Sequence, residues 1–162
     1  MAVLVVGGAG YIGSHMVRHL GENNIEAIVF DNFEKGHREA VGSAPVFEGD
    51  LRNKADVRRV FETQDISAVM HFSAYSLVGE SMQQPGLYYE NNIGGTLNVL
   101  EAMNRAGVRH FIFSSTAAVY GEPVSIPIDE CHPAAPTNVY GETKLAVEKM
   151  LGWFDHVHGI KS

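Results

Sequence analysis

Cysteine is nearly absent from this sequence, because Cys131 is the only one among 162 residues. A single thiol excludes a disulfide within the chain, and with it the small folds that depend on disulfides. A reducing compartment is therefore expected, and we predict a cytoplasmic location. A nucleophilic cysteine needs a neighbouring base, and we interpret Cys131, in a proline-rich stretch, as a spectator thiol.

Positive charge is also scarce, since 12 Lys and Arg stand against 19 Asp and Glu and give a net charge of -7. Such a balance provides no basic face for a phosphate backbone or an anionic membrane surface. We therefore expect no nucleic-acid partner and no membrane partner. The eight histidines, His15 and His19 among them, lack carboxylates at ligand spacing, so we expect no metal site.

Long apolar runs are missing too, and no stretch approaches the roughly 20 residues that span a bilayer. The apolar N-terminus, MAVLVV, has no basic leader and continues directly into glycines. It is typical of a buried strand and not of a signal peptide.

What the sequence does contain is a regular alternation of short β-branched runs and longer amphipathic stretches. This alternation predicts a doubly wound α/β fold, with a parallel sheet covered on both faces, in a single domain over 1–162. A proline-rich irregular segment is expected over 121–138. The predicted strands are 3–6, 27–30, 46–48, 68–72 and 110–114, and the predicted helices are 12–22, 54–63, 87–106 and 139–156.

A glycine-rich turn joins the first predicted strand to the first predicted helix: Gly7, Gly8, Gly10 and Gly13 satisfy both GxxGxxG and GxGxxG. Glycines in this context permit a sharp turn, close approach of a pyrophosphate, and close packing of helix on strand. The helix N-terminus would then present free N–H groups and a positive dipole end to that pyrophosphate. The pattern is typical of a Rossmann-like dinucleotide site.

Asp31, at the end of the second predicted strand, supports this interpretation. A carboxylate there can accept hydrogen bonds from an adenosine ribose and repel a 2′-phosphate, which favours NAD over NADP. Because ligands bind at the carboxyl ends of such strands, Asp50 is a further candidate, either accepting from the adenine amine or capping the following helix. Leu51, 72–76 and 114–116 follow strands in the same way.

Tyr140 and Lys144 lie four residues apart, and therefore on one face of the last predicted helix. A neighbouring ammonium stabilises a phenolate, so Lys144 would make Tyr140 a usable proton acceptor for a substrate alcohol. Thr116, just beyond the fifth strand, could place its hydroxyl against the same substrate oxygen, or simply cap a turn. A surface Tyr–Lys pair without catalytic meaning is the alternative for YxxxK taken alone.

Taken together, the segments GGAGYIGSH, DNFEKG, GDL, HFSAYSLVGES, YYENNIGGT, FSSTAAVYG and YGETK resemble the extended short-chain dehydrogenase/reductase family, and most of all its members that epimerise UDP-hexoses at C4. The resemblance covers nearly the whole chain. It implies NAD as cofactor, a UDP-sugar such as UDP-glucose or UDP-galactose as substrate, and a transient 4-keto sugar with no net redox change. It also implies a homodimer through the helices 87–106 and 139–156.

By the same resemblance, Tyr140 is the acid/base, Lys144 lowers its pKa and binds the nicotinamide ribose, and Thr116 contacts the substrate hydroxyl. Ser76 stands where many members have a lysine, which would weaken retention of NAD. The implied cofactor-binding residues are Gly7, Gly10, Tyr11, Ile12, Gly13, Asp31, Asn32, Lys35, Gly36, Asp50, Leu51, Phe72, Ser73, Ala74, Ser76, Asn91, Ser114, Tyr140 and Lys144.

Members that dehydrate or decarboxylate nucleotide sugars carry acidic residues just after the Ser/Thr, where this chain has Ala117 and Ala118. In the family, a further strand and a C-terminal substrate domain follow the Tyr-bearing helix. We therefore expect this chain to be the cofactor-binding portion, truncated before those parts. The alternatives are a non-catalytic NAD-binding module, a truncated inactive product, and an alcohol or other sugar-nucleotide dehydrogenase.

Overall fold

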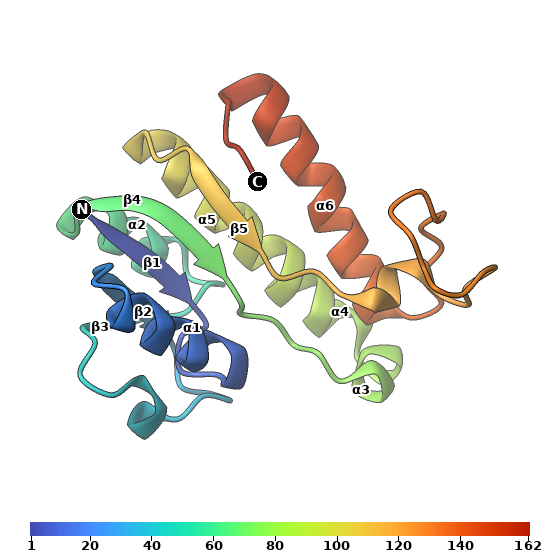
Figure 1. Cartoon of the computed structure of the whole chain (residues 1–162), viewed down its shortest axis with the longest axis horizontal. Helices are drawn as coiled ribbons and strands as arrows, with labels where there is room; N and C mark the ends of the chain where they lie inside the picture. Colours follow the sequence, from blue (N-terminus) through green and yellow to red (C-terminus); the bar gives the residue numbers. More distant parts are fainter.

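A computed structural model describes all 162 residues and shows one parallel sheet with helices on both faces (Figure 1). The strand order is β3-β2-β1-β4-β5, and every neighbouring pair is parallel. The order reverses direction between β1 and β4, as the doubly wound prediction requires. The strands are β1 (Ala2–Val6), β2 (Ala27–Asp31), β3 (Val46–Glu48), β4 (Ile66–His71) and β5 (His110–Phe113).

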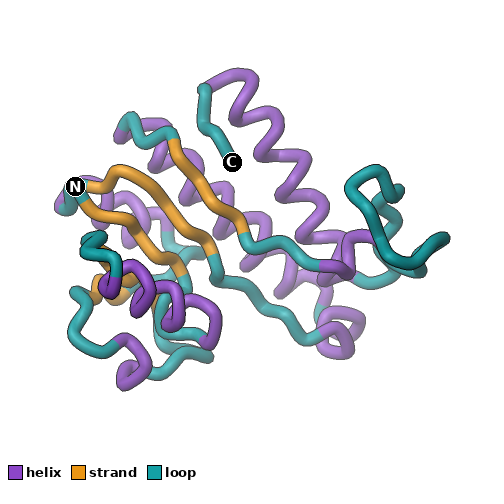
Figure 2. Tube along the Cα trace, viewed as in Figure 1, coloured by secondary structure: helices purple, strands orange, loops and turns teal.

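The helices divide between the two faces of the sheet (Figure 2). On one face α1 (Tyr11–Glu22) packs its Val17 and Leu20 on the sheet. On the other face lie α2 (Lys54–Thr63), α5 (Gly95–Ala106) and α6 (Val139–His158), with one larger apolar cluster beneath them. Along β1, Leu4 and Val6 belong to the larger cluster and Val5 to the smaller, so an uninterrupted apolar strand supplies both cores.

Local signals begin α2 and α6, and end α5, at the predicted places. The Asn53 side chain accepts from the amide of Ala55 and starts α2, and the Asn138 Oδ1 accepts from the amide of Gly141 at 2.8 Å and starts α6. Gly107, with a φ of 75°, ends α5 in the left-handed conformation that favours glycine.

The predicted helix 87–106 is interrupted in the structure. It consists of α4 (Pro85–Tyr88), a π-helical turn η2 (Tyr89–Gly94) and α5, all along one continuous path. The π turn places Asn91 and Asn92 in buried positions. The 87–106 prediction therefore has the right extent but the wrong hydrogen-bond pattern over its first third.

Other differences from the predictions are small. Strand β4 starts at Ile66, two residues before the predicted start, and α6 extends to His158. A short helix α3 (Val78–Gln83) and two 3₁₀ turns, η1 (Arg38–Val41) and η3 (Ala117–Tyr120), were not predicted. The segment 121–138 contains no helix or strand, as expected.

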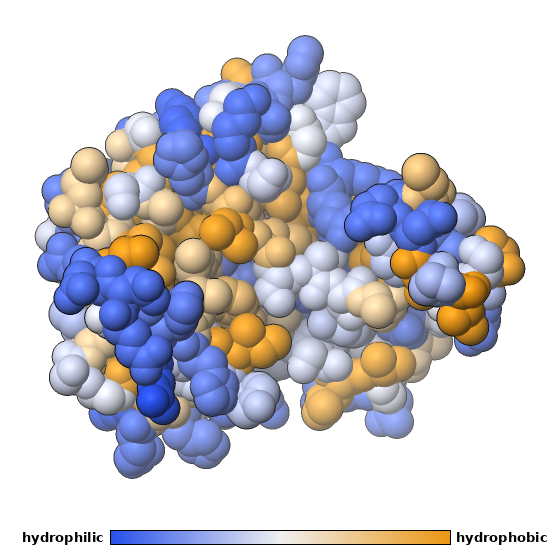
Figure 3. Space-filling view, viewed as in Figure 1, coloured by the Kyte–Doolittle hydropathy of each residue, from blue (hydrophilic) through white to orange (hydrophobic).

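Beyond β5 the sheet is open. Ile112 of β5 is 53% exposed, and apolar surface occupies the centre of the face seen in Figure 3, over β4 and β5. After α6 the chain returns to this edge, where Lys161 forms a single parallel bridge with His110 and Ile160 is fully buried. None of the helices combines the length and apolar content that crossing a membrane would require.

Candidate cofactor and catalytic site

The predicted cofactor residues gather where β1, β2, β3 and β4 end. A hollow of about 100 Å³ lies at this edge, next to a smaller one of about 20 Å³. The two share four lining residues, Asp31, Asn32, Ser73 and Asn91. The predicted residues that line one or both are Gly7, Gly10, Asp31, Asn32, Lys35, Gly36, Asp50, Leu51, Phe72, Ser73, Ala74 and Asn91.

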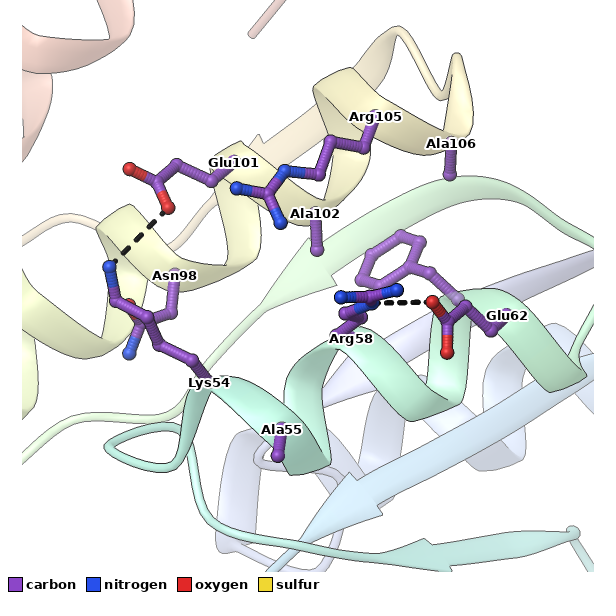
Figure 4. Close-up of a pocket in the computed structure, with 10 residues that line it drawn as sticks. Lys54, Ala55, Arg58, Glu62, Asn98, Glu101, Ala102, Arg105 and Ala106 are labelled. Atoms are coloured by element: carbon purple, nitrogen blue, oxygen red, sulfur yellow. Dashed lines mark hydrogen bonds and ion pairs between the residues drawn. The ribbon is translucent and has the colours of Figure 1, made fainter.

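Two larger hollows lie away from the strand ends. One, of about 530 Å³, lies between α2 and α5 (Figure 4), and the other, of about 570 Å³, lies beside α1. In the first, Lys54 pairs with Glu101 at 3.5 Å and Arg58 with Glu62 at 2.5 Å, so most of its charges satisfy one another. Neither hollow brings together groups that could do chemistry, and we place the site at the strand ends.

The glycine turn is built for backbone contact at close range. A Cβ on Gly7, whose φ is 78°, would lie 2.6 Å from the amide nitrogen of Ser73, and a Cβ on Gly13 would lie 2.1 Å from the carbonyl oxygen of Gly7. No side chain caps the start of α1, and its first turn carries no acidic residue. The free amides at this helix end therefore remain available to an anion, as the motif predicted.

Asp31 ties the loop after β2 to this turn. Its Oδ2 accepts from the amide of Ala9 at 3.0 Å and its Oδ1 accepts from the amide of Phe33 at 2.8 Å. Because a carboxylate can accept about four hydrogen bonds, each oxygen keeps capacity for a ribose hydroxyl. The position predicted for Asp31 is thus compatible with the role predicted for it.

Asp50 is more heavily engaged than the sequence suggested. Its Oδ1 accepts from the backbone amide and the Nε of Arg52 at 2.8 and 2.9 Å, and its Oδ2 accepts from Asn32 Nδ2 at 3.1 Å and from Arg52 Nη2 at 2.5 Å. The hydrogen bonds from Arg52 lower the pKa of Asp50 to about 2. An adenine amine could bind Asp50 only if one of these donors, most simply the neutral Asn32 amide, moved aside.

Tyr140 and Lys144 occupy successive turns of α6, and a close backbone contact brings them to Thr116. A Cβ on Gly141 would lie 2.5 Å from the carbonyl oxygen of Ala118, so glycine is what lets α6 pack on η3. The Thr116 Oγ1 accepts from the amide of Ala118 at 3.2 Å, so this side chain caps the start of η3. This bond leaves the hydroxyl hydrogen of Thr116 free to donate. The Tyr140 amide donates to Ser81, and the half-buried phenol hydroxyl has no partner within the chain.

Lys144 is buried, and only 3% of it is exposed. Its Nζ donates to the carbonyl oxygen of Ser114 at 2.8 Å and lies 4.6 Å from the centre of the Phe113 ring. Burial lowers the pKa of Lys144 to about 8. The ammonium therefore lies in a weakly screened setting, where electrostatic interactions are stronger than in water.

Seven of the predicted cofactor residues do not line the hollows. Tyr11 and Ile12 are 82% and 56% exposed in the first turn of α1, and Ser76 is exposed after β4. Gly13 packs beneath the turn, and Ser114 contributes its carbonyl to Lys144. The other two are Tyr140 and Lys144, which lie at the start of α6. Thr116 lies after β5 and is also outside the hollows.

Several residues in the site carried no sequence signal that we recognised. Arg52 immediately follows the GDL segment, and Gly141 is the residue after Tyr140 within YGETK.

His71 is buried, and its Nε2 lies 2.8 Å from Thr96 Oγ1, which itself donates to the carbonyl of Asn92. The Nε2 of His71 must therefore carry the proton, and burial lowers the pKa of His71 to about 3. No three His, Cys, Asp or Glu side chains gather where they could hold a metal ion.

Known proteins match this chain over nearly its whole length. The model of the NAD dependent epimerase/dehydratase family matches residues 3–162. The UDP-glucose 4-epimerase of Halalkalibacterium halodurans is 52% identical over 161 residues, which are 99% of this chain and 48% of that protein. The chain thus spans about half the length of the curated relatives it matches.

Solved structures agree. The UDP-glucose 4-epimerase from Brucella ovis in complex with NAD has a TM-score of 0.96 at 41% identity. The match covers 99% of this chain and 49% of the Brucella ovis chain. The UDP-glucose 4-epimerase from Thermotoga maritima with UDP-glucose has a TM-score of 0.95 at 36% identity. That match covers 99% of this chain and 53% of the Thermotoga maritima chain.

Proposed function

Because this chain belongs to the NAD dependent epimerase/dehydratase family, we propose that it is the cofactor-binding and proton-transferring portion of an enzyme that inverts C4 of a UDP-hexose. The resemblance drawn from its motifs is confirmed at the level of the family. UDP-glucose and UDP-galactose are the proposed substrates, supported by relatives that carry the name UDP-glucose 4-epimerase. The absence of acidic residues at Ala117 and Ala118 favours epimerisation over dehydration within the family.

The residues at the strand ends suit NAD. Gly7 and Gly13 leave a cradle that a Cβ would fill, the α1 amides are uncapped, and Asp31 has acceptor capacity beside them. A diphosphate would bind the amides at the start of α1, and the adenosine ribose would bind Asp31. The acidic side chain at this position disfavours the extra phosphate of NADP.

The proposed chemistry divides between the cofactor and three side chains. Bound NAD supplies a group that accepts a hydride from C4 and returns it. Tyr140 removes and returns the proton of the 4-hydroxyl, because the charge of Lys144 one turn away stabilises its phenolate. Thr116, with its hydroxyl hydrogen free, holds the same substrate oxygen. The alternatives of a non-catalytic binding module and of an alcohol dehydrogenase account less well for a buried lysine beside an unpartnered phenol.

The observation that carries this proposal is the conjunction of an uncapped, glycine-lined helix start with the Tyr140 and Lys144 pair at the same edge of the sheet. Its first test is to denature the purified chain and identify any released nucleotide by absorbance and mass, with NAD as the expected result. In an enzyme that contains this chain, Tyr140→Phe should slow interconversion of UDP-galactose and UDP-glucose by orders of magnitude. An unaffected rate would overturn the role of Tyr140.

Self-association and location form part of the same proposal. Trp153 and Val157, one turn apart on α6, are 69% and 64% exposed, although both are large and apolar. Such a face suits a homodimer in which α5 and α6 of two subunits pack together. The single exposed thiol of Cys131 fits a reducing cytoplasm.

A further inference from the structure

Three side chains from three separate loops meet at one edge of the nucleotide hollow. The Tyr75 hydroxyl donates to Glu34 Oε1 at 2.6 Å, Arg52 Nη2 donates to Glu34 Oε2 at 2.9 Å, and Arg52 Nη1 donates to the Tyr75 hydroxyl at 3.0 Å. Each side chain thus contacts the other two. We call Glu34, Arg52 and Tyr75 the clasp.

The clasp joins opposite walls of the hollow. Glu34 lies in the loop after β2 and Tyr75 lies after β4, and both line the same hollow of about 100 Å³. Together with its neighbour of about 20 Å³, this space is well below the roughly 300 Å³ at which ligand clefts usually begin. A hollow of this size leaves little room for an adenosine while Glu34 and Tyr75 stay joined.

The loop after β2 is anchored at both ends and held in its middle by side-chain contacts. Its ends are held, because Asp31 bonds the amide of Ala9 and the amide of His37 donates to the carbonyl of Ala9 at 3.0 Å. Between these anchors Phe33 has a φ of 57°, a conformation that a bulky residue adopts only when its surroundings hold it. The middle of the loop is thus kept in place by contacts that include the clasp.

The three side chains of the clasp differ in how much of each is exposed to solvent. The Glu34 and Arg52 side chains are 41% and 27% exposed, so parting them leaves each charge in contact with water. Tyr75 is 8% exposed and packs on Tyr88 with ring centres 5.8 Å apart, so it stays with the body of the domain. The hydrogen bond from Tyr75 lowers the pKa of Glu34 further below neutral pH, so this carboxylate is charged in the pair. A partly hydrated ion pair of this kind is weak enough to open and close repeatedly.

We propose that the clasp is a gate on the adenosine end of the cofactor site, and that Glu34 must separate from Arg52 and Tyr75 each time the dinucleotide enters or leaves. This inference rests on the proposed function, since it takes NAD as the ligand. Glu34, Arg52 and Tyr75 are positioning residues, and none of them is assigned a chemical step. A gate changes the rates of entry and exit together, whereas a direct contact with bound ligand changes mainly the rate of exit.

The test measures NADH binding to this chain by stopped-flow fluorescence, with release followed by displacement with excess NAD. Two variants weaken the clasp: Glu34→Gln removes the charge, and Tyr75→Phe removes only a hydroxyl and keeps the packed ring. Glu101→Gln is the matched control, because Glu101 is 38% exposed against 41% for Glu34 and loses an ion pair with Lys54 outside the nucleotide hollow. Both clasp variants should raise the association and dissociation rates by about five- to tenfold, and change Kd by less than about threefold.

The remaining outcomes each overturn a distinct statement. Rates that match the control in both variants would refute the gate, and so would a Kd that rises in step with dissociation while association stays constant. Failure of the unaltered chain to bind NADH at any accessible concentration would refute the proposed cofactor and the gate with it. Normal binding with unchanged kinetics in the variants would refute the gate alone.

Discussion

At Gly13 one added methyl group should decouple the first helix from the first strand. Its Cβ would meet the carbonyl oxygen of Gly7 at 2.1 Å, a distance that no rotamer change can relieve because both partners are backbone. We expect Gly13→Ala to lower the free energy of unfolding by about 2–4 kcal/mol and to abolish NADH binding. Thermal or urea unfolding together with a binding titration checks both effects.

Gly21 provides the control within the same helix. It is exposed in the last turn of α1, and nothing lies within 4 Å of a Cβ added there. Gly21→Ala should therefore stabilise the chain by about 0.5–1 kcal/mol through helix propensity and leave binding unchanged. Equal effects of the two substitutions would show that the turn tolerates a side chain.

The buried ammonium of Lys144 should cost stability at neutral pH. Burial lowers its pKa from 10.5 to about 8, so between these values the unfolded chain holds a proton that the folded chain has lost. Stability must then rise with pH across this window and carry the full penalty, about 3 kcal/mol, below pH 8. A charge retained in such a place, against stability, is what a catalytic lysine would require.

Lys144→Met tests this account, since Met fills the space without the charge. We expect it to raise the free energy of unfolding by about 1–3 kcal/mol at pH 7, reduced by the lost bond to the Ser114 carbonyl. The difference between variant and unaltered chain should shrink as the pH rises from 8 to 10.5 and level off above 10.5, where Lys144 is neutral in both states. Urea unfolding of both chains at pH 7 and pH 10 measures this difference in the free energy of unfolding. A difference independent of pH would assign the effect to packing.

At the scale of elements, the π-helical turn η2 depends on one buried amide. The Asn92 Oδ1 accepts from the amide of Tyr75 at 2.9 Å, and its Nδ2 donates to the Tyr75 carbonyl at 3.0 Å and to Thr143 at 3.1 Å. This side chain therefore joins η2 to the loop after β4 and to α6, and it fixes Tyr75, the stationary member of the clasp.

Asn92→Ala would leave both backbone groups of Tyr75 without partners in a buried setting. We predict a loss of about 2–4 kcal/mol in the free energy of unfolding, accompanied by weaker NADH binding. Asn104→Ala is the control on the same helical path, because the Asn104 side chain makes no hydrogen bond within the chain and the change should be nearly neutral. The two unfolding curves, recorded side by side, decide whether the amide network or the helix itself is responsible.

The same network explains which elements could be predicted from sequence. Strands such as Ala27–Asp31 are uninterrupted apolar runs because both faces of a parallel strand are buried, and this pattern is visible locally. The π turn and α3 are not, because partners distant in sequence hold them: Asn92 bonds Thr143, and the Tyr88 hydroxyl lies 2.7 Å from Glu80 and 2.8 Å from the Leu77 carbonyl.

The candidate site divides along the same line. Its glycine turn, Asp31 and the Tyr140 and Lys144 pair follow from spacing within one or two elements, and the structure brings them to one edge of the sheet. Arg52 and the clasp could not be predicted, since Glu34, Arg52 and Tyr75 meet only after three loops have been placed by three different strands.

At the scale of the whole molecule, the outer face of α6 is a surface suited to a partner. Trp153 and Val157 are more than 60% exposed. They lie on the face of the sheet that α2, α5 and α6 cover, away from the strand-end site. Burying two large apolar side chains per subunit is worth roughly 3–6 kcal/mol before the cost of association. A dimer through α5 and α6 would remove this surface from water without covering the nucleotide hollow.

We therefore predict that the chain is a dimer at micromolar concentration and that Trp153→Glu converts it to a monomer, because the introduced carboxylate would be buried without a partner in the paired state. NADH binding should survive, since α6 presents Trp153 on the face opposite its contact with the sheet. Ile25→Glu is the control: Ile25 is 46% exposed after α1, on the other side of the sheet, and its replacement should leave the dimer intact. Light scattering at several concentrations distinguishes these outcomes, and a monomeric unaltered chain would refute the dimer.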